Sequence, residues 1–187
     1  MLDNTDKTIL LKLARETLQS HFSNEATPAR RTTRPALLEQ KGAFVSLHRG
    51  EELRGCIGQL SPDCALFEIV QHCALSAALE DTRFAAVMQK ELKDLSIEIS
   101  VLTPFHRIRS VEEIEVGRHG LYIVRGGFRG LLLPQVATQY NWDRTQFLEH
   151  TCMKSGLPAS AWRDPHTIIH TFEAEVFSDS NISTSAQ

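Results

Sequence analysis

The sequence predicts an α+β protein whose sheet is largely antiparallel. Apolar residues recur at helical spacing in some segments and alternate with polar residues in others. The two kinds of segment neither alternate regularly nor repeat, which argues against a parallel βαβ architecture. A chain of 187 residues has the length to bury a real core, as one domain or as a core domain with a small subdomain.

Three stretches are expected to be helices: 5–22, 61–81 and 142–158. Each carries an apolar stripe with a period near 3.6 residues. The expected N-terminal caps are Asn4, Thr5 or Asp6 for the first helix, Ser61 with Pro62 for the second, and Asp143 with Gln146 for the third. In the second helix, Cys64 falls in the first turn and Cys73 on the buried stripe.

The other apolar segments predict strands. A β-hairpin is expected within 42–60, with 48–52 as its turn. Segment 95–103 alternates cleanly between apolar and polar residues, and 120–134 predicts a second hairpin. One last strand is expected at about 167–177.

We expect residues 1–187 to form a single domain. The polar segment at about 23–35 has two prolines and no periodicity, so we expect a flexible connector there. The residues after Phe177 are rich in Ser, Asn and Thr, which predicts a frayed tail at about 178–187.

Composition narrows the classes of function. The formal net charge of −3 gives no basic surplus for nucleic-acid binding. The chain has no apolar run near the roughly 20 residues of a membrane span and no signal-peptide pattern. Its four cysteines form no C-x-x-C pair and no disulfide framework, so reduced thiols in a cytoplasmic protein are expected.

The hexapeptide LRGCIG, residues 53–58, contains the main candidate for chemistry. Strand alternation would place Arg54, Cys56 and Gly58 on one face, with Leu53 and Ile57 on the core face. An arginine about 7 Å along the strand favours a thiolate. Gly55 and Gly58 would leave space and backbone N–H groups open to a ligand. The alternative is a Cys56 buried beneath a helix, with glycines that only let the helix approach, and the residues alone leave both open.

The hexapeptide also resembles the signature of the AMMECR family. Similar blocks follow in that family's order: DTRF (81–84), LSIEISVLTP (95–104), GRHGL (117–121), GLLLPQV (130–136) and WDRTQFLEHTCMKSGLP (142–158). The resemblance implies an α+β fold in which a larger subdomain carries LRGCIG, a smaller one follows, and a cleft lies between them. It also implies a Memo-like protein and a radical-SAM enzyme as partners. The family implies no settled reaction.

Other side chains are weaker candidates for the same site. Glu98 and Ser100 share the polar face of their strand, so Glu98 is a candidate partner for Arg54, or else part of a plain surface salt bridge. His119, in a tight turn, is a weak candidate for a base acting on Cys56. Asp81 and Arg83 are expected to cap and tether the loop after a helix. No histidine or cysteine spacing indicates a metal site, and no cofactor is expected.

Two functional hypotheses follow. The first is a cytosolic enzyme or enzyme component with a cleft centred on Cys56 and Arg54, lined by Gly55, Gly58 and Ser100. The second is a non-catalytic module that binds the Memo-like or radical-SAM partner and presents a small-molecule or peptide substrate. Neither hypothesis calls for nucleic acid or a membrane.

Overall fold

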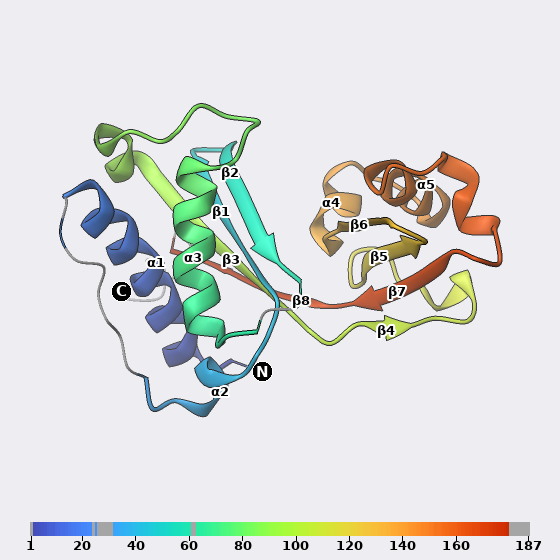
Figure 1. The fold of residues 1–187 in the computed structure, drawn as a ribbon, viewed down its shortest axis with the longest axis horizontal. Coiled ribbons are helices and arrows are strands. Elements are labelled where there is room, and N and C mark those ends of the chain that lie inside the picture. Colours follow the sequence, from blue (N-terminus) through green and yellow to red (C-terminus); the bar gives the residue numbers. More distant parts are fainter. Residues whose placement is uncertain (1, 24, 26–31, 61–62, 180–187) are drawn as a thin grey trace. The chain divides into compact units, whose positions relative to one another are not determined.

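The computed structural model describes residues 2–23, 25, 32–60 and 63–179. The chain forms two compact units, each with its own sheet and its own hydrophobic core (Figure 1). The first unit contains residues up to Val101 and from Glu175 onward, and the second unit spans Leu102–Ala174. The α+β class predicted from the sequence is therefore confirmed, with two antiparallel sheets in place of one.

The first unit packs helices on one face of a four-stranded sheet. Its helices are α1 (Asn4–Phe22), α2 (Pro35–Leu38), α3 (Leu66–Leu79) and a 3₁₀ helix, Gln89–Asp94. Its strands, in the spatial order β2-β1-β3-β8, are β2 (Glu52–Gln59), β1 (Ala43–Arg49), β3 (Leu95–Leu102) and β8 (Ala174–Ser178). Helix α3 lies against β1 and β2, and α1 lies beside α3 (Figure 1). The core includes Val45 and Leu47 of β1, Ile97 and Ile99 of β3, and Ile69 of α3.

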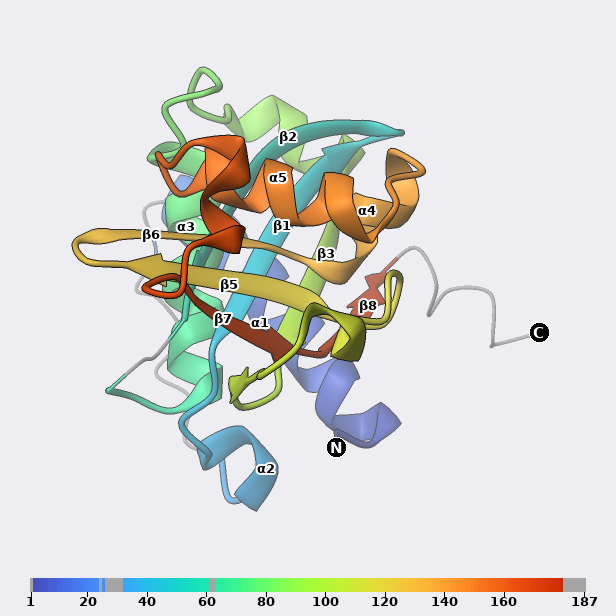
Figure 2. The ribbon, with the colours of Figure 1, turned by 90° about the vertical axis from the view of Figure 1, so that its right-hand side faces the viewer.

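The second unit covers one face of its sheet with α5. Its strands, in the spatial order β4-β7-β5-β6, are β4 (His106–Arg107), β7 (Ile168–Phe172), β5 (Gly120–Arg125) and β6 (Phe128–Leu132). Its helices are α4 (Pro134–Gln139), α5 (Arg144–Lys154) and the 3₁₀ helices Val111–Glu113 and Ala159–Arg163. Helix α5 packs on β5 and β6 (Figure 2), and Phe147 is fully buried at this contact.

The helix ends follow local hydrogen bonding. The expected cap of the third helix is confirmed: Asp143 accepts from the Gln146 N–H, and Gln146 accepts in return from the Asp143 N–H. Helix α1 is capped one residue earlier than expected, by Asp3. The second helix begins at Leu66, because the Glu68 carboxylate accepts the Ala65 N–H at 2.9 Å and starts the helix there.

That later start corrects the position of Cys64. This residue lies before α3 and is exposed, whereas Cys73 is buried in the core as expected. The expected cap at Ser61 and Pro62 lies outside the described residues.

The expected last strand at 167–177 is wrong as a single element. The chain leaves β7 at Phe172 and enters β8 at Ala174, so the two strands belong to different sheets. Glu173 marks the crossing, and Thr103 pairs with it there through two hydrogen bonds. Most of the expected connector, at 24 and 26–31, and most of the expected tail, at 180–187, lie outside the described residues.

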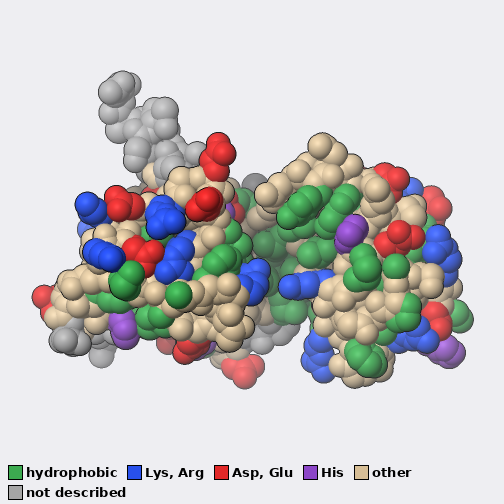
Figure 3. All heavy atoms as spheres, turned by 90° about the horizontal axis from the view of Figure 1, so that it is seen from above, with side chains coloured by type: hydrophobic (Ala, Val, Ile, Leu, Met, Phe, Trp, Pro, Cys, Tyr) green, Lys and Arg blue, Asp and Glu red, His purple; other side chains and the backbone are tan. Residues whose placement is uncertain are grey.

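The helix lengths and the surface charges bear on binding to membranes and to nucleic acids. Within the part of the chain that the structure describes, no helix is long and apolar enough to cross a membrane. Acidic and basic side chains are interspersed on the visible face of each unit (Figure 3). That face therefore carries no continuous basic surface of the kind that binds a nucleic-acid backbone.

Candidate functional site

A β-bulge in β2 decides which way the hexapeptide side chains point. Leu47 pairs with Gly55 while the next residue of β1, His48, pairs with Leu53, so Arg54 is the extra residue of the bulge. The bulge moves Leu53 to the face opposite the core, and Leu53 is only partly buried. The expectation that Leu53 belongs to the core face is therefore wrong, whereas Ile57 does pack against the core.

Gly55 is required by the packing of α3. A Cβ built on Gly55 would lie 2.0 Å from the carbonyl oxygen of Ala77 in α3, far inside contact distance. The close-helix explanation therefore holds for Gly55. It does not extend to Cys56, because strand alternation turns Cys56 to the face opposite α3.

The face opposite α3 carries a three-by-three set of side chains that we call the Cys56 array. Strand register defines its three rows, each written from β2 through β1 to β3: Gly58–Phe44–Ser100, Cys56–Ser46–Glu98 and Leu53–His48–Ser96. Most of these side chains are polar or ionisable, and Ser46 and Ser100 are buried. A buried polar sheet face costs free energy unless its groups find partners, so the array is the strongest candidate site in the first unit.

Cys56 is a protonated thiol at neutral pH. Ser46 Oγ donates a hydrogen bond to Cys56 Sγ at 3.2 Å. Burial raises the pKa of the Cys56 thiol, and the Ser46 hydrogen bond and the Arg83 charge offset only part of this effect. The sequence-based expectation that Arg54 lowers this pKa is wrong: burial outweighs the one positive charge that acts on the thiol, and that charge belongs to Arg83.

Arg54 is fully engaged away from the thiol. Its guanidinium forms a bidentate pair with Glu91 at 3.0 and 3.2 Å and donates to the carbonyls of Ala85 and Ala86. The expected pairing with Glu98 is wrong, since β1 separates the strand of Arg54 from that of Glu98. Arg54 therefore anchors the loop after α3 to the edge strand.

Asp81 and Arg83 bind the backbone of Cys56. Strand β2 is at the sheet edge, where the backbone groups of Cys56 that point outward need partners. The Cys56 N–H donates to Asp81 at 2.9 Å, and Arg83 donates to the Cys56 carbonyl at 3.2 Å. The same two side chains pair with each other at 2.7 Å, and Arg83 holds the pKa of Asp81 down at about 2. Together they replace a neighbouring strand and fix the position of the thiol, a role beyond the loop tether expected from the sequence.

His48 is the array residue that sequence reasoning missed. The sequence predicts a hairpin turn at His48, but β1 continues through Arg49, and His48 follows Phe44 and Ser46 on the same face. Its Nε2 is buried and has no hydrogen-bond partner among the described residues. The alternation of Phe44, Ser46 and His48 along the sequence is the signal that places His48 on this face of the strand. His48 lies diagonally across from both Cys56 and Glu98, a spacing of about 7–8 Å between Cα atoms that long side chains bridge.

The remaining candidates have different surroundings. The ring of Phe44 fills the space at Gly58, 2.3 Å from the position of a built Cβ, so the missing side chain of Gly58 makes room for this ring. A ligand at the Gly58 backbone stays a prediction. Ser100 is 1% exposed and lies in the row of Gly58.

His119 belongs to the second unit, where its Nδ1 accepts from the Glu115 N–H, and its action on Cys56 stays a prediction. The cleft between the subdomains also stays a prediction.

Metal ligation has no geometric support in the described parts of the chain. No group of three or more His, Cys, Asp or Glu side chains there is arranged to hold a metal ion. All four cysteines are free thiols. The chemistry that the array offers is that of a thiol, hydroxyls, an imidazole and a carboxylate.

The fold and the array define the class: a two-unit α+β protein with a cysteine on the polar face of an antiparallel sheet. The AMMECR1 family model matches residues 11–177. A protein of Thermococcus gammatolerans is 41% identical over 181 residues, 91% of this chain and 88% of the relative, and one of Methanosarcina barkeri is 39% identical over 188 residues, 96% and 93% of the two chains. The crystal structure of the uncharacterised protein PH0010 from Pyrococcus horikoshii matches with a TM-score of 0.86 at 38% identity, covering 91% of this chain and 89% of that one. The chain belongs to the AMMECR1 family.

Proposed function

We propose that this protein is an enzyme component in which Cys56 supplies a nucleophile and His48 a base. By resemblance it corresponds to protein A of the AmmeMemoRadiSam system, which works with a Memo-like protein and a radical-SAM enzyme in the cytoplasm. Its substrate would be a small molecule or a peptide segment with an electrophilic carbon.

One observation carries the proposal: the buried His48 Nε2 has no partner among the described residues, and strand register places His48 diagonally across from Cys56 and from Glu98 on one sheet face. An unpartnered buried nitrogen costs free energy, which a functional role would explain. When His48 takes the thiol proton, the sulfur becomes able to bond to an electrophile. The Glu98 carboxylate, diagonally across from His48 on β3, would form an ion pair with the resulting imidazolium.

A specific observation favours a second candidate. The raised pKa of the Cys56 thiol and the full engagement of Arg54 describe a cysteine that is not activated at rest. A non-catalytic module would need no activated thiol. In that case, the array would form part of a surface that binds the Memo-like or radical-SAM partner and presents a substrate.

Reconstitution with the two partners separates the candidates. Turnover of a cell metabolite extract is compared for wild-type protein, Cys56→Ser and the matched control Cys64→Ser, which alters an exposed thiol outside the array. If the protein is an enzyme component, Cys56→Ser abolishes turnover and Cys64→Ser does not. The Cys56→Ser protein should still associate with both partners. If Cys56→Ser retains full turnover, Cys56 is not a nucleophile in the reaction, and the non-catalytic binding module is favoured.

A further inference from the structure

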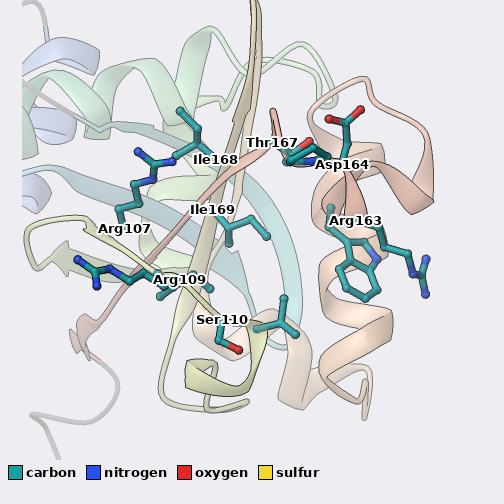
Figure 4. Close-up of a pocket in the computed structure, with 12 residues that line it drawn as sticks. Arg107, Arg109, Ser110, Arg163, Asp164, Thr167, Ile168 and Ile169 are labelled. Carbon is teal, nitrogen blue, oxygen red and sulfur yellow. The ribbon is translucent and has the colours of Figure 1, made fainter.

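A pocket of about 650 Å³ is lined wholly by residues of the second unit, and none of them belongs to the Cys56 array. Residues 107–111 form one wall and residues 162–165 the other, and the beginning of β7 lies between them (Figure 4). Ile108 and Ile169 give the pocket an apolar floor. Its volume falls within the range of small-molecule sites.

The pocket is rich in arginine. Arg107 and Arg109 come from the first wall and Arg163 from the second (Figure 4). The single carboxylate in the lining, Asp164, is already paired with Arg125 at 2.8 Å. The pocket therefore carries a positive charge in a chain whose formal net charge is −3.

The arginines of the pocket lack the carboxylate partners that most of the described arginines have. Seven arginines pair with carboxylates: Arg15, Arg34, Arg49, Arg54, Arg83, Arg118 and Arg125. Among the described residues, no carboxylate forms an ion pair with the guanidinium of Arg107, Arg109 or Arg163. Glu113, near Arg109, instead accepts the backbone N–H groups of Arg109 and Ser110.

Trp162 is another residue of the pocket lining. Its Nε1 is buried and has no acceptor among the described residues. The Arg163 guanidinium stacks on the Trp162 ring, 4.0 Å from the centroid, and this contact keeps a positive charge beside the indole.

We propose that this pocket binds a small organic polyanion, a molecule with an apolar body and two or more phosphate or carboxylate groups. Guanidinium groups bind both kinds of oxyanion through paired hydrogen bonds. Arginines on opposite walls suit a ligand with anionic groups at more than one position, and the isoleucine floor suits an apolar body. The site is independent of the function proposed for Cys56.

The test follows the indole N–H signals of the full-length ¹⁵N-labelled protein by NMR. Inorganic pyrophosphate and citrate are titrated separately, with chloride at matched ionic strength as the blank, and Trp162→Phe assigns the signal. We expect a saturable shift of the Trp162 N–H and none from Trp142. Tighter binding of pyrophosphate identifies a phosphate ligand, and tighter binding of citrate a carboxylate ligand.

Substitutions then assign the shift to the pocket. Arg107→Gln with Arg109→Gln should weaken binding by about tenfold or more, because charged hydrogen bonds are lost. Arg129→Gln removes an exposed arginine of β6 outside the pocket and should leave binding unchanged. Arg163→Gln replaces the double variant if the latter loses native signal dispersion. No Trp162 shift with either probe, or equal weakening by Arg129→Gln, would overturn the proposal.

Discussion

Asp81 links the position of the thiol to the stability of the first unit. Its carboxylate is almost fully buried, binds Arg83 and the Cys56 N–H, and has a pKa of about 2 in place of its ordinary value. A carboxyl whose pKa is lowered in the folded state stabilises that state above the unfolded pKa, and this contribution disappears as pH falls through the folded pKa. The lowered pKa of Asp81 is expected to contribute about 2 kcal/mol to the free energy of unfolding at neutral pH.

Asp81→Asn should therefore lower the free energy of unfolding by about 2 kcal/mol at neutral pH, with a smaller difference at acid pH. Urea unfolding of both proteins between about pH 7 and pH 2 measures the difference, which should shrink below about pH 4. A difference that stays constant over this range would show that the carboxylate charge is not responsible.

Single residues of the site were predictable only in part. The pattern of LRGCIG identifies Cys56 as the residue of interest and places it opposite the core, and the structure agrees. It could not reveal the bulge at Arg54, because local alternation contains no information about pairing with β1. Nor could it reveal the contact of Asp81 and Arg83 with Cys56, which joins segments far apart in the sequence.

At the scale of elements, the contact of α3 with β2 depends on the missing side chain of Gly55. Gly55→Ala would push a methyl group to within 2.0 Å of the Ala77 carbonyl and force the helix and strand apart. We expect a loss of about 3 kcal/mol or more in the free energy of unfolding. Gly127→Ala is the matched control, since nothing lies within 4 Å of its built Cβ.

Denaturant titration of the two glycine variants gives the comparison. The control should differ from wild type by less than about 0.5 kcal/mol. Equal stability of Gly55→Ala and wild type would mean that α3 does not press on this strand.

Periodicity predicted the longer elements and failed at their junctions. The α1, α3 and α5 helices and the two hairpins were all expected, since a continuous stripe or alternation marks them. The split between β7 and β8 was not, because residues on both sides of Glu173 keep an extended backbone while the chain changes sheets. The short helix α4 was also missed, since six residues are too few to show a helical period.

At the scale of the whole molecule, the second unit is a continuous segment whose ends meet. Thr103 and Glu173 pair near the two ends of this segment, and the unit has its own core and sheet. We therefore predict that residues 102–174 fold when expressed alone. Dispersed amide NMR signals and cooperative thermal unfolding would support this, whereas a collapsed signal envelope would show that the second unit needs the first.

Alkylation of Cys56 across pH tests the central claim, that the array controls this thiol. After brief iodoacetamide treatment, site-resolved mass spectrometry should find that Cys56 is alkylated more slowly than the exposed Cys64 near neutral pH. The alkylation rate of Cys56 should rise with a pKa above the ordinary value of a thiol. Arg83→Gln and His48→Gln should slow Cys56 further, since they remove a positive charge and a base, while Arg54→Gln should change little because Glu91 already neutralises it. A Cys56 titration below the ordinary value that moves only with Arg54→Gln would contradict the account.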